Sequence, residues 1–87
     1  MPILGIDQTP NPNAVKITFD RQIAPKATTF TSAQAAEHHP IAHAILKVEG
    51  VASVFIVNNF ATVTRKPTSD WAEIAPKLQI ALTEIGE

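Results

Sequence analysis

The chain has 87 residues, of which 45% are hydrophobic and 17% charged, and its formal net charge is −1. That length suffices for a hydrophobic core, and we expect residues 1–87 to form a single domain. The charge balance argues against nucleic-acid binding, which needs a basic surface. Cysteine is absent, which excludes disulfides, thiolate nucleophiles and any zinc or iron–sulfur site built from cysteines.

We expect neither a signal peptide nor a membrane span in this sequence. The N-terminal residues do not combine a basic segment with a long apolar one, as a signal peptide would. The longest apolar run covers residues 54–57, whereas a membrane span requires roughly 20 residues. We therefore expect a cytoplasmic protein that has no membrane partner.

The first third of the chain predicts strands separated by a loop and a turn. Residues 3–7 place Ile, Leu and Ile around a glycine and predict a strand. Residues 14–19 alternate with period two, which is typical of a half-buried strand. Between them, residues 8–13 read QTPNPN, and the two prolines favour an ordered loop. Residues 21–25 predict a turn, and residues 28–31 predict a short third strand.

A proline divides the predicted helical region in the middle of the chain. Ser32 can cap a short helical turn formed by the good helix formers that follow it. Pro40 interrupts this turn, but proline is tolerated in the first turn of a helix, so we expect a second helix to begin near it. Gly50 is expected to end that helix. Its apolar stripe comprises Ile41, Ala42, Ile45, Leu46 and Val48.

A hairpin follows the second helix. Residues 51–58 and 60–66 are rich in β-branched and aromatic side chains and predict two strands. Asn58 and Asn59 lie at their junction. Because asparagine tolerates a positive φ better than any residue except glycine, the pair predicts a two-residue turn between antiparallel strands.

The last predicted element is a helix that begins after Asp70. Asp70 can cap it, and Glu73 would complete a capping box three residues later. Pro76 falls inside and predicts a kink or a one-turn break, and Gly86 is a stop signal. The apolar face comprises Trp71, Ile74, Leu78, Leu82 and Ile85.

The order strand, strand, short strand, helix, hairpin, helix predicts an α+β fold. We expect a two-layer domain in which the helices lie on one face of a mostly antiparallel or mixed sheet. A small sheet can leave an edge strand open for pairing, so the sequence leaves the oligomeric state undetermined.

The histidines are the first candidates for a chemical site. His39 and His43 are four residues apart, a spacing that can place two metal ligands on one helix face, and His38 and Glu37 lie beside them. Pro40 stands between the two and disturbs that geometry. We favour a solvated polar helix start, assign no metal and no cofactor, and keep His38, His39 and His43 as the ligands of an alternative metal-carrier function.

The sequence contains no pattern that indicates catalysis. The carboxylates are scattered, and the hydroxyls alternate along strands or cap helices. Nucleophile-elbow, phosphate-loop and dinucleotide-binding motifs are absent. We therefore expect no enzymatic activity.

The proline-rich loop is the least generic segment and a candidate interaction surface. It consists of Thr9, Pro10, Asn11, Pro12 and Asn13. It is either a rigid turn whose asparagines satisfy local backbone groups or an exposed, preorganised loop for a partner. The Asn58-Asn59 hairpin tip is a second candidate surface. Trp71 is expected in the core, or at an interface if it lies at the rim.

Several short motifs together resemble the N-terminal domain of Nfu/NifU iron–sulfur scaffold proteins. The first is TPNPN at 9–13, followed by AVKI at 14–17. The others are PIA at 40–42, Leu46, EGV at 49–51, SVF at 53–55, FATVT at 60–64 and DW at 70–71, with Pro76 beyond. Their order and spacing fit the family from Thr9 to about Ile85, which is nearly the whole chain.

The resemblance implies a compact α+β domain that, in longer members, precedes a CxxC-bearing domain holding or delivering an iron–sulfur cluster. Without cysteine the present residues cannot bind a cluster through thiolates, so we expect a stand-alone member that lacks the CxxC domain. Its implied role is a non-enzymatic accessory or interaction domain, with iron–sulfur assembly or client proteins as partners. An adaptor unrelated to iron–sulfur chemistry is a further alternative.

Overall fold

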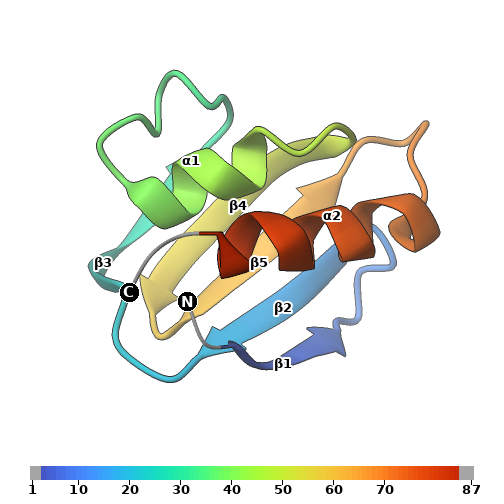
Figure 1. The fold of residues 1–87 in the computed structure, drawn as a ribbon. Coiled ribbons are helices and arrows are strands. Elements are labelled where there is room, and N and C mark those ends of the chain that lie inside the picture. The colour runs from blue at the N-terminus through green and yellow to red at the C-terminus, as the bar shows by residue number, and fades with distance from the viewer. Residues whose placement is uncertain (1–2, 85–87) are drawn as a thin grey trace.

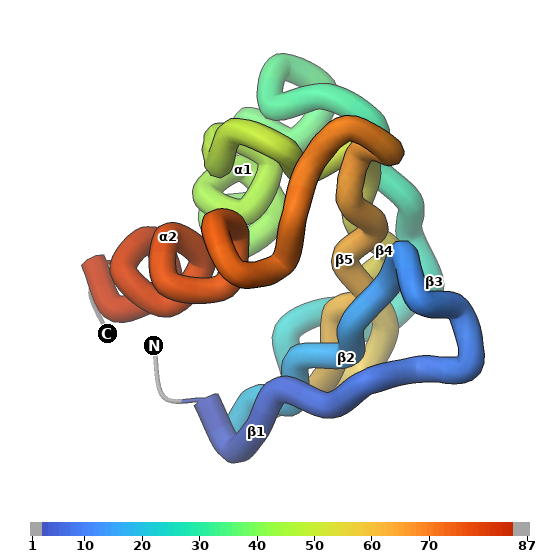
Figure 2. The backbone as a smooth tube through the Cα atoms, turned by 90° about the vertical axis from the view of Figure 1, so that its right-hand side faces the viewer, coloured from blue at the N-terminus to red at the C-terminus, as the bar shows by residue number. Residues whose placement is uncertain are grey.

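The computed structural model describes residues 3–84. In chain order its elements are β1 (Ile3–Gln8), β2 (Ala14–Phe19), β3 (Ala24–Phe30), α1 (Pro40–Leu46), β4 (Val51–Asn58), β5 (Phe60–Arg65) and α2 (Trp71–Thr83). The strands form one five-stranded sheet in the order β1-β2-β5-β4-β3, and each neighbouring pair is antiparallel. Both helices cover the same face of the sheet (Figures 1 and 2), which confirms the predicted α+β class. Within residues 3–84, no helix has the length and hydropathy to cross a membrane.

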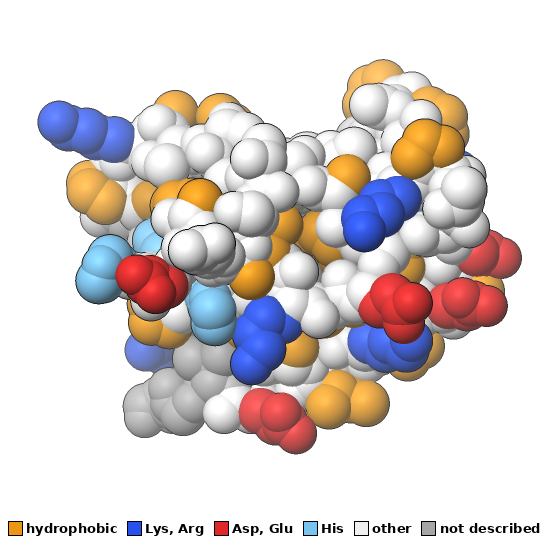
Figure 3. Space-filling model, turned by 90° about the horizontal axis from the view of Figure 1, so that it is seen from above, with side chains coloured by type: hydrophobic (Ala, Val, Ile, Leu, Met, Phe, Trp, Pro, Cys, Tyr) orange, Lys and Arg blue, Asp and Glu red, His pale blue; other side chains and the backbone are white. Residues whose placement is uncertain are grey.

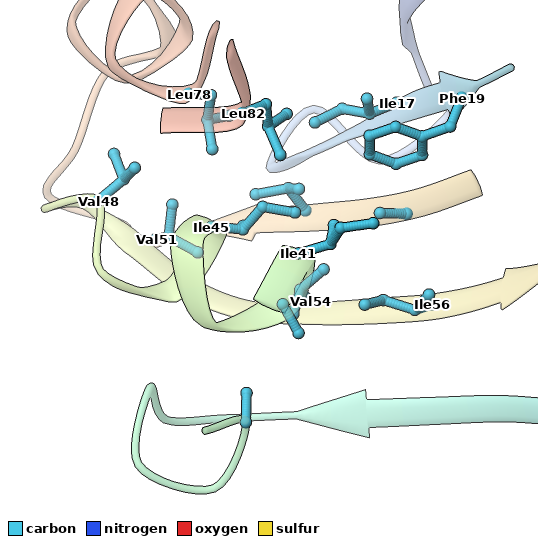
Figure 4. Packing of buried hydrophobic residues seen from close by; sticks show 14 of the residues in the cluster. Ile17, Phe19, Ile41, Ile45, Val48, Val51, Val54, Ile56, Leu78 and Leu82 are labelled. Carbon is cyan, nitrogen blue, oxygen red and sulfur yellow. The ribbon is translucent and has the colours of Figure 1, made fainter. Parts of the chain in front are cut away.

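The hydrophobic core fills the space between the sheet and the helices (Figure 4). Alternate residues of the inner strands point toward the helices, as the period-two pattern predicts, and Ile17, Phe19, Val54 and Ile56 are fully buried. The helices contribute Ile41, Ala42 and Ile45 from α1 and Ile74, Leu78 and Leu82 from α2. Each large apolar side chain buried in this way stabilises the fold by about 1.5–3 kcal/mol, so this layer holds both helices on the sheet.

The third strand is longer than the sequence predicts, and the predicted turn at 21–25 is wrong in its second half. β3 already begins at Ala24, which lies opposite Asn58 of β4, and the ladder is irregular between Ala24 and Thr28. Pro25 falls in this irregular part. Because β3 is an edge strand, a residue without an N–H group can be accommodated there. Pairing with β4, rather than local propensity, therefore sets where the strand begins.

The division of the middle segment around Pro40 is confirmed. The Ser32 hydroxyl accepts the Ala35 N–H at 3.1 Å and opens a run of turns over residues 33–38. Helix α1 then begins at Pro40. It ends at Leu46, four residues earlier than the predicted stop at Gly50, because turn hydrogen bonds replace the helical ones after that point.

The hairpin between β4 and β5 forms as predicted. Val57 and Phe60 are the last paired residues, so Asn58 and Asn59 form the turn, and Asn58 has a φ of 54°. Asparagine is one of the few residues that adopt this left-handed conformation at low cost.

Helix α2 is continuous through Pro76, so of the two predicted alternatives the one-turn break is wrong and the kink stays a prediction. The proline removes one backbone hydrogen bond, but the buried residues before and after it keep the helix on the sheet. Asp70 accepts the Ala72 N–H at 3.1 Å and caps the helix. The Glu73 N–H donates to the Asp70 carbonyl oxygen at 3.0 Å, but within residues 3–84 the Glu73 carboxylate accepts no bond from the Asp70 N–H, so the predicted cap forms without the reciprocal bond of a capping box. Ile85 and Gly86 lie outside the described residues.

Candidate functional site

The proline-rich loop between β1 and β2 is held in shape by its own hydrogen bonds. The Thr9 hydroxyl lies 2.9 Å from the Asn11 carbonyl oxygen and 3.0 Å from that of Ala14, and it accepts the Asn11 N–H at 3.1 Å. The Asn11 side chain accepts the Asn13 N–H at 2.9 Å. The segment is therefore a rigid turn whose residues 10–13 are exposed, and its use as a loop for a partner stays a prediction.

Two contacts from distant parts of the chain fix the loop to the rest of the fold. The Arg65 N–H at the end of β5 donates to the Asn13 carbonyl oxygen at 2.8 Å. The Trp71 indole N–H donates to the Pro12 carbonyl oxygen at 3.1 Å. Trp71 is partly buried and packs against the core edge. Trp71 therefore lies at the rim of the core rather than inside it, and it connects α2 to the loop.

A cleft of about 300 Å³ opens between the loop and the first turn of α2. We call it the loop cleft, and its lining comprises Gln8, Thr9, Pro10, Asn11, Pro12, Ala14, Val15 and Trp71. None of these side chains is a carboxylate, histidine or lysine, and the Thr9 hydroxyl is engaged with the backbone of Asn11 and Ala14. Apolar walls and amide groups are suited to hold a partner segment by contact and hydrogen bonding. Gln8 and Val15 were not predicted as site residues; they flank the loop in the sequence and pair with each other where β1 and β2 meet it.

The ring nitrogens of two histidines are engaged by the backbone. His39 is the N-cap of α1: its Nδ1 accepts the Ala42 N–H at 3.3 Å, so its Nε2 carries the hydrogen and donates to the Ile23 carbonyl oxygen at 3.1 Å. His43 donates from Nδ1 to the Ala33 carbonyl oxygen at 2.9 Å. His39 would have to abandon the helix cap to bind a metal ion.

Figure 3 shows the histidine side chains gathered at one end of the molecule, near an acidic side chain. His38 is 96% exposed, and its Nε2 lies 3.7 Å from the Glu37 carboxylate. Within residues 3–84, no group of three or more histidine, aspartate or glutamate side chains is arranged to hold a metal ion. The four-residue spacing of His39 and His43 thus serves to anchor the segment before α1.

The asparagines of the hairpin tip are exposed, but their backbone contacts are structural. The Asn59 amide donates to the Phe19 carbonyl oxygen at 3.3 Å, and the Phe19 N–H donates to the Asn59 carbonyl oxygen at 2.7 Å. The Asn58 carbonyl oxygen accepts the Ile23 N–H at 2.6 Å. The tip therefore ties the ends of β2 and β3 to the hairpin, and its role as an interaction surface stays a prediction.

The sheet face away from the helices carries a feature that the sequence reasoning missed. The Lys16 ammonium lies 4.5 Å from the centre of the Phe60 ring, and Phe55 is 37% exposed on the same face. The alternation in each strand does place Lys16 and Phe60 away from the core. Only the pairing of β2 with β5 shows that the two side chains meet.

Comparison with known proteins places residues 3–87 in the family described as scaffold protein Nfu/NifU N terminal. The conserved virulence factor C of Staphylococcus saprophyticus is 33% identical over the full length of this chain, which covers 23% of that protein. The mitochondrial NFU1 iron-sulfur cluster scaffold homolog of Drosophila grimshawi is 35% identical over 80% of this chain and 24% of its own length. The chain thus spans about a quarter of the length of these relatives.

Two solved structures share the fold. Protein SAV1430 from Staphylococcus aureus superposes with a TM-score of 0.79 at 34% identity, and the match covers 94% of this chain and 99% of that one. A NifU-like protein from Saccharomyces cerevisiae gives a TM-score of 0.77 at 24% identity over 92% of this chain and 74% of its own, a likeness of fold alone. The five-stranded antiparallel sheet, the motifs from the proline-rich loop to Trp71 and these matches together show that the chain belongs to the Nfu/NifU N-terminal family.

Proposed function

We propose that residues 1–87 form a single non-enzymatic interaction domain that contacts proteins of iron–sulfur cluster assembly or delivery in the cytoplasm. The family, and the Drosophila relative's name as an iron-sulfur cluster scaffold homolog, support the iron–sulfur setting. The chain has no cysteine, so the proposed contribution is contact with partner proteins rather than ligation of a cluster by thiolates.

The observation that carries this proposal is the construction of the loop cleft. The TPNPN residues, which belong to the motifs resembling the family, lie in an exposed loop instead of the core. Their hydrogen bonds and the Trp71 contact fix the loop before any partner arrives. A preformed loop loses little conformational entropy on binding, which favours recognition.

The test is affinity capture with the immobilised domain from a lysate of its host. We expect scaffold, carrier or client iron–sulfur proteins at stoichiometric levels, identified by mass spectrometry. Pro10→Arg places a charge on the exposed loop and should abolish this recovery. Gln34→Arg introduces the same charged group at an exposed position between β3 and α1, and should leave it unchanged.

Two outcomes contradict the proposal. Stoichiometric recovery of unrelated proteins only would indicate an adaptor outside iron–sulfur chemistry. Recovery of iron–sulfur proteins that is equal for the wild type and the Pro10→Arg variant would place the contact surface away from the loop cleft.

A further inference from the structure

Two hollows lie between the edge strand β1 and the flank of α2 that faces it. One is a hollow of about 450 Å³ lined by Ile3, Gly5, Ile6, Gln79 and Thr83. The loop cleft adjoins the other end of β1, where Gln8 and Trp71 line it. Figure 1 shows β1 at the margin of the sheet, beyond the cover of α2. We call this surface, from Trp71 to Thr83 along the helix, the β1–α2 groove.

The helix flank that faces the groove carries no charge. Trp71, Ala75, Gln79 and Thr83 follow one another at intervals of four, so they form one stripe along α2. By the same geometry the charged residues within the helix, Glu73 and Lys77, point to the other side. This stripe therefore suits an uncharged partner surface.

Two of the three large hydrophobic side chains that are exposed within residues 3–84 adjoin the groove. Leu4 is 68% exposed and Ile80 is 60% exposed. Neither side chain lines the groove itself: Leu4 lies in the irregular stretch of β1 between Ile3 and Gly5, and Ile80 lines a separate shallow hollow of α2 that shares Gln79 and Thr83 with the groove. The third, Phe55, lies on the opposite face of the sheet. Exposed apolar side chains beside a groove are typical of a binding surface.

The two edges of the sheet differ in how they are protected. β3 carries Pro25, Lys26 and an irregular stretch, which are devices that prevent another strand from pairing. β1 is irregular only between Ile3 and Gly5, and the remainder to Gln8 pairs regularly with β2 and contains neither proline nor lysine. The outer backbone groups of this part are positioned to accept a further strand.

One acidic side chain on β1 indicates the charge of such a strand. Asp7 is exposed, and no cation of the described residues lies within ion-pair distance of it. Lys16 is its partner in the register, but the Lys16 ammonium lies over the Phe60 ring. A residue directly opposite Asp7 on an added strand would have its Cβ about 5 Å away, where a basic side chain is favoured.

We propose that the β1–α2 groove binds an extended peptide segment of a partner protein, which adds to the sheet as a strand beside β1. Its inward side chains are apolar and fill the groove, and a basic side chain lies opposite Asp7. This proposal goes beyond the iron–sulfur role and does not depend on it, because it concerns the chemistry of the bound segment and not the identity of the partner protein that contains it.

The probe is a synthetic peptide, Gly-Ser-Val-Thr-Ile-Arg-Val-Thr-Val-Ser-Gly, capped at both ends and titrated into the ¹⁵N-labelled protein. In an extended strand its apolar residues face one side and its arginine the other. We expect saturable shifts of the backbone amides of residues 5–8, Gln79 and Thr83. A peptide with glutamate in place of arginine should bind about threefold more weakly, because like charges opposite each other are destabilising.

Charge reversal provides the matched control. Asp7→Lys should make the glutamate peptide bind more tightly than the arginine peptide. Glu49→Lys, a charge reversal at an exposed residue outside the groove, should leave the arginine peptide as the tighter of the two. Ile80→Ser should weaken both peptides, and Phe55→Ser, which removes the exposed side chain on the opposite sheet face, should weaken neither.

Three results would overturn the proposal. The first is an absence of saturable shifts up to about 2 mM peptide, the millimolar limit of weak binding. The second is an Asp7→Lys variant that still binds the arginine peptide more tightly than the glutamate peptide. The third is self-association in the absence of peptide: a doubling of mass in sedimentation, together with changes in the amide chemical shifts of β1 as the protein concentration rises. This result would make a second copy of this chain the occupant.

Discussion

Gly50→Ala tests how closely the turn between α1 and β4 packs against the start of α2. Gly50 has a φ of 102°, a backbone conformation that L-residues rarely adopt. A Cβ atom there would lie 2.9 Å from the Ser69 hydroxyl oxygen and 3.0 Å from Cγ1 of Ile74. Ile74 is 1% exposed, so its side chain has little room to move. Gly50→Ala therefore combines backbone strain with overpacking.

The magnitude follows from these two costs. The positive φ costs an L-residue about 1–2 kcal/mol, and overpacking a filled core costs about 1–3 kcal/mol. Alanine also restricts the unfolded chain, which offsets about 0.4–1 kcal/mol. We expect Gly50→Ala to lower the free energy of unfolding by about 2–4 kcal/mol, a large part of the roughly 5–15 kcal/mol typical of a domain.

The assay is urea unfolding followed by the fluorescence of Trp71, the sole tryptophan. Gly5→Ala is the matched control, because its Cβ would have as nearest neighbour the Asp7 carboxylate oxygen at 3.9 Å and Gly5 has no positive φ. The control should stay within about 1 kcal/mol of the wild type. Equal losses in the two variants, or a loss below about 1 kcal/mol for Gly50→Ala, would refute the reasoning.

Three further changes probe the loop and the histidines. Trp71→Phe removes the hydrogen bond to Pro12 and should cost about 0.5–1.5 kcal/mol; faster amide exchange of Asn11, Asn13 and Ala14 by NMR checks that the loop has loosened, and unchanged exchange contradicts it. His39→Ala should cost about 1–2 kcal/mol in urea unfolding, because it removes the cap of α1, and His39→Asn should recover part of that loss; no difference between them would argue against the capping role. Zinc(II) titration calorimetry should show no binding tighter than about 1 mM, because His39 uses both ring nitrogens; tighter binding that is lost in His38/His39/His43→Ala would restore the metal-carrier alternative.

Local chemistry was enough to predict some features of the fold from the sequence. Pro40 begins α1, and the Asn58-Asn59 turn joins two strands, because proline and asparagine restrict or permit particular backbone angles at their own positions. The alternation in β2 likewise shows which side chains face the core. The first part of β3 was missed because its assignment depends on hydrogen bonds to β4, residues distant in sequence.

The candidate site was predictable only in part for the same reason. The TPNPN segment was visible, but the donor that fixes it, Trp71, lies 59 residues from Pro12. The histidine spacing suggested a shared ligand set. In the folded chain His39 and His43 instead bond separate carbonyl groups, those of Ile23 and Ala33, which no spacing rule relates to them.

Strand order then joins the two proposed surfaces. β1 is an edge strand because β5 of the hairpin pairs with the side of β2 that faces away from β1, so β1 has β2 as its one neighbour in the sheet. Gln8 ends β1 and also lines the loop cleft, so a segment that pairs with β1 and continues past Gln8 would enter the cleft beside Trp71. Because each surface can be disabled separately, by Asp7→Lys or by Pro10→Arg, a captured partner that loses affinity in both variants would show that one segment occupies both surfaces. Loss in Pro10→Arg alone would confine that partner to the loop cleft and leave the groove to another ligand.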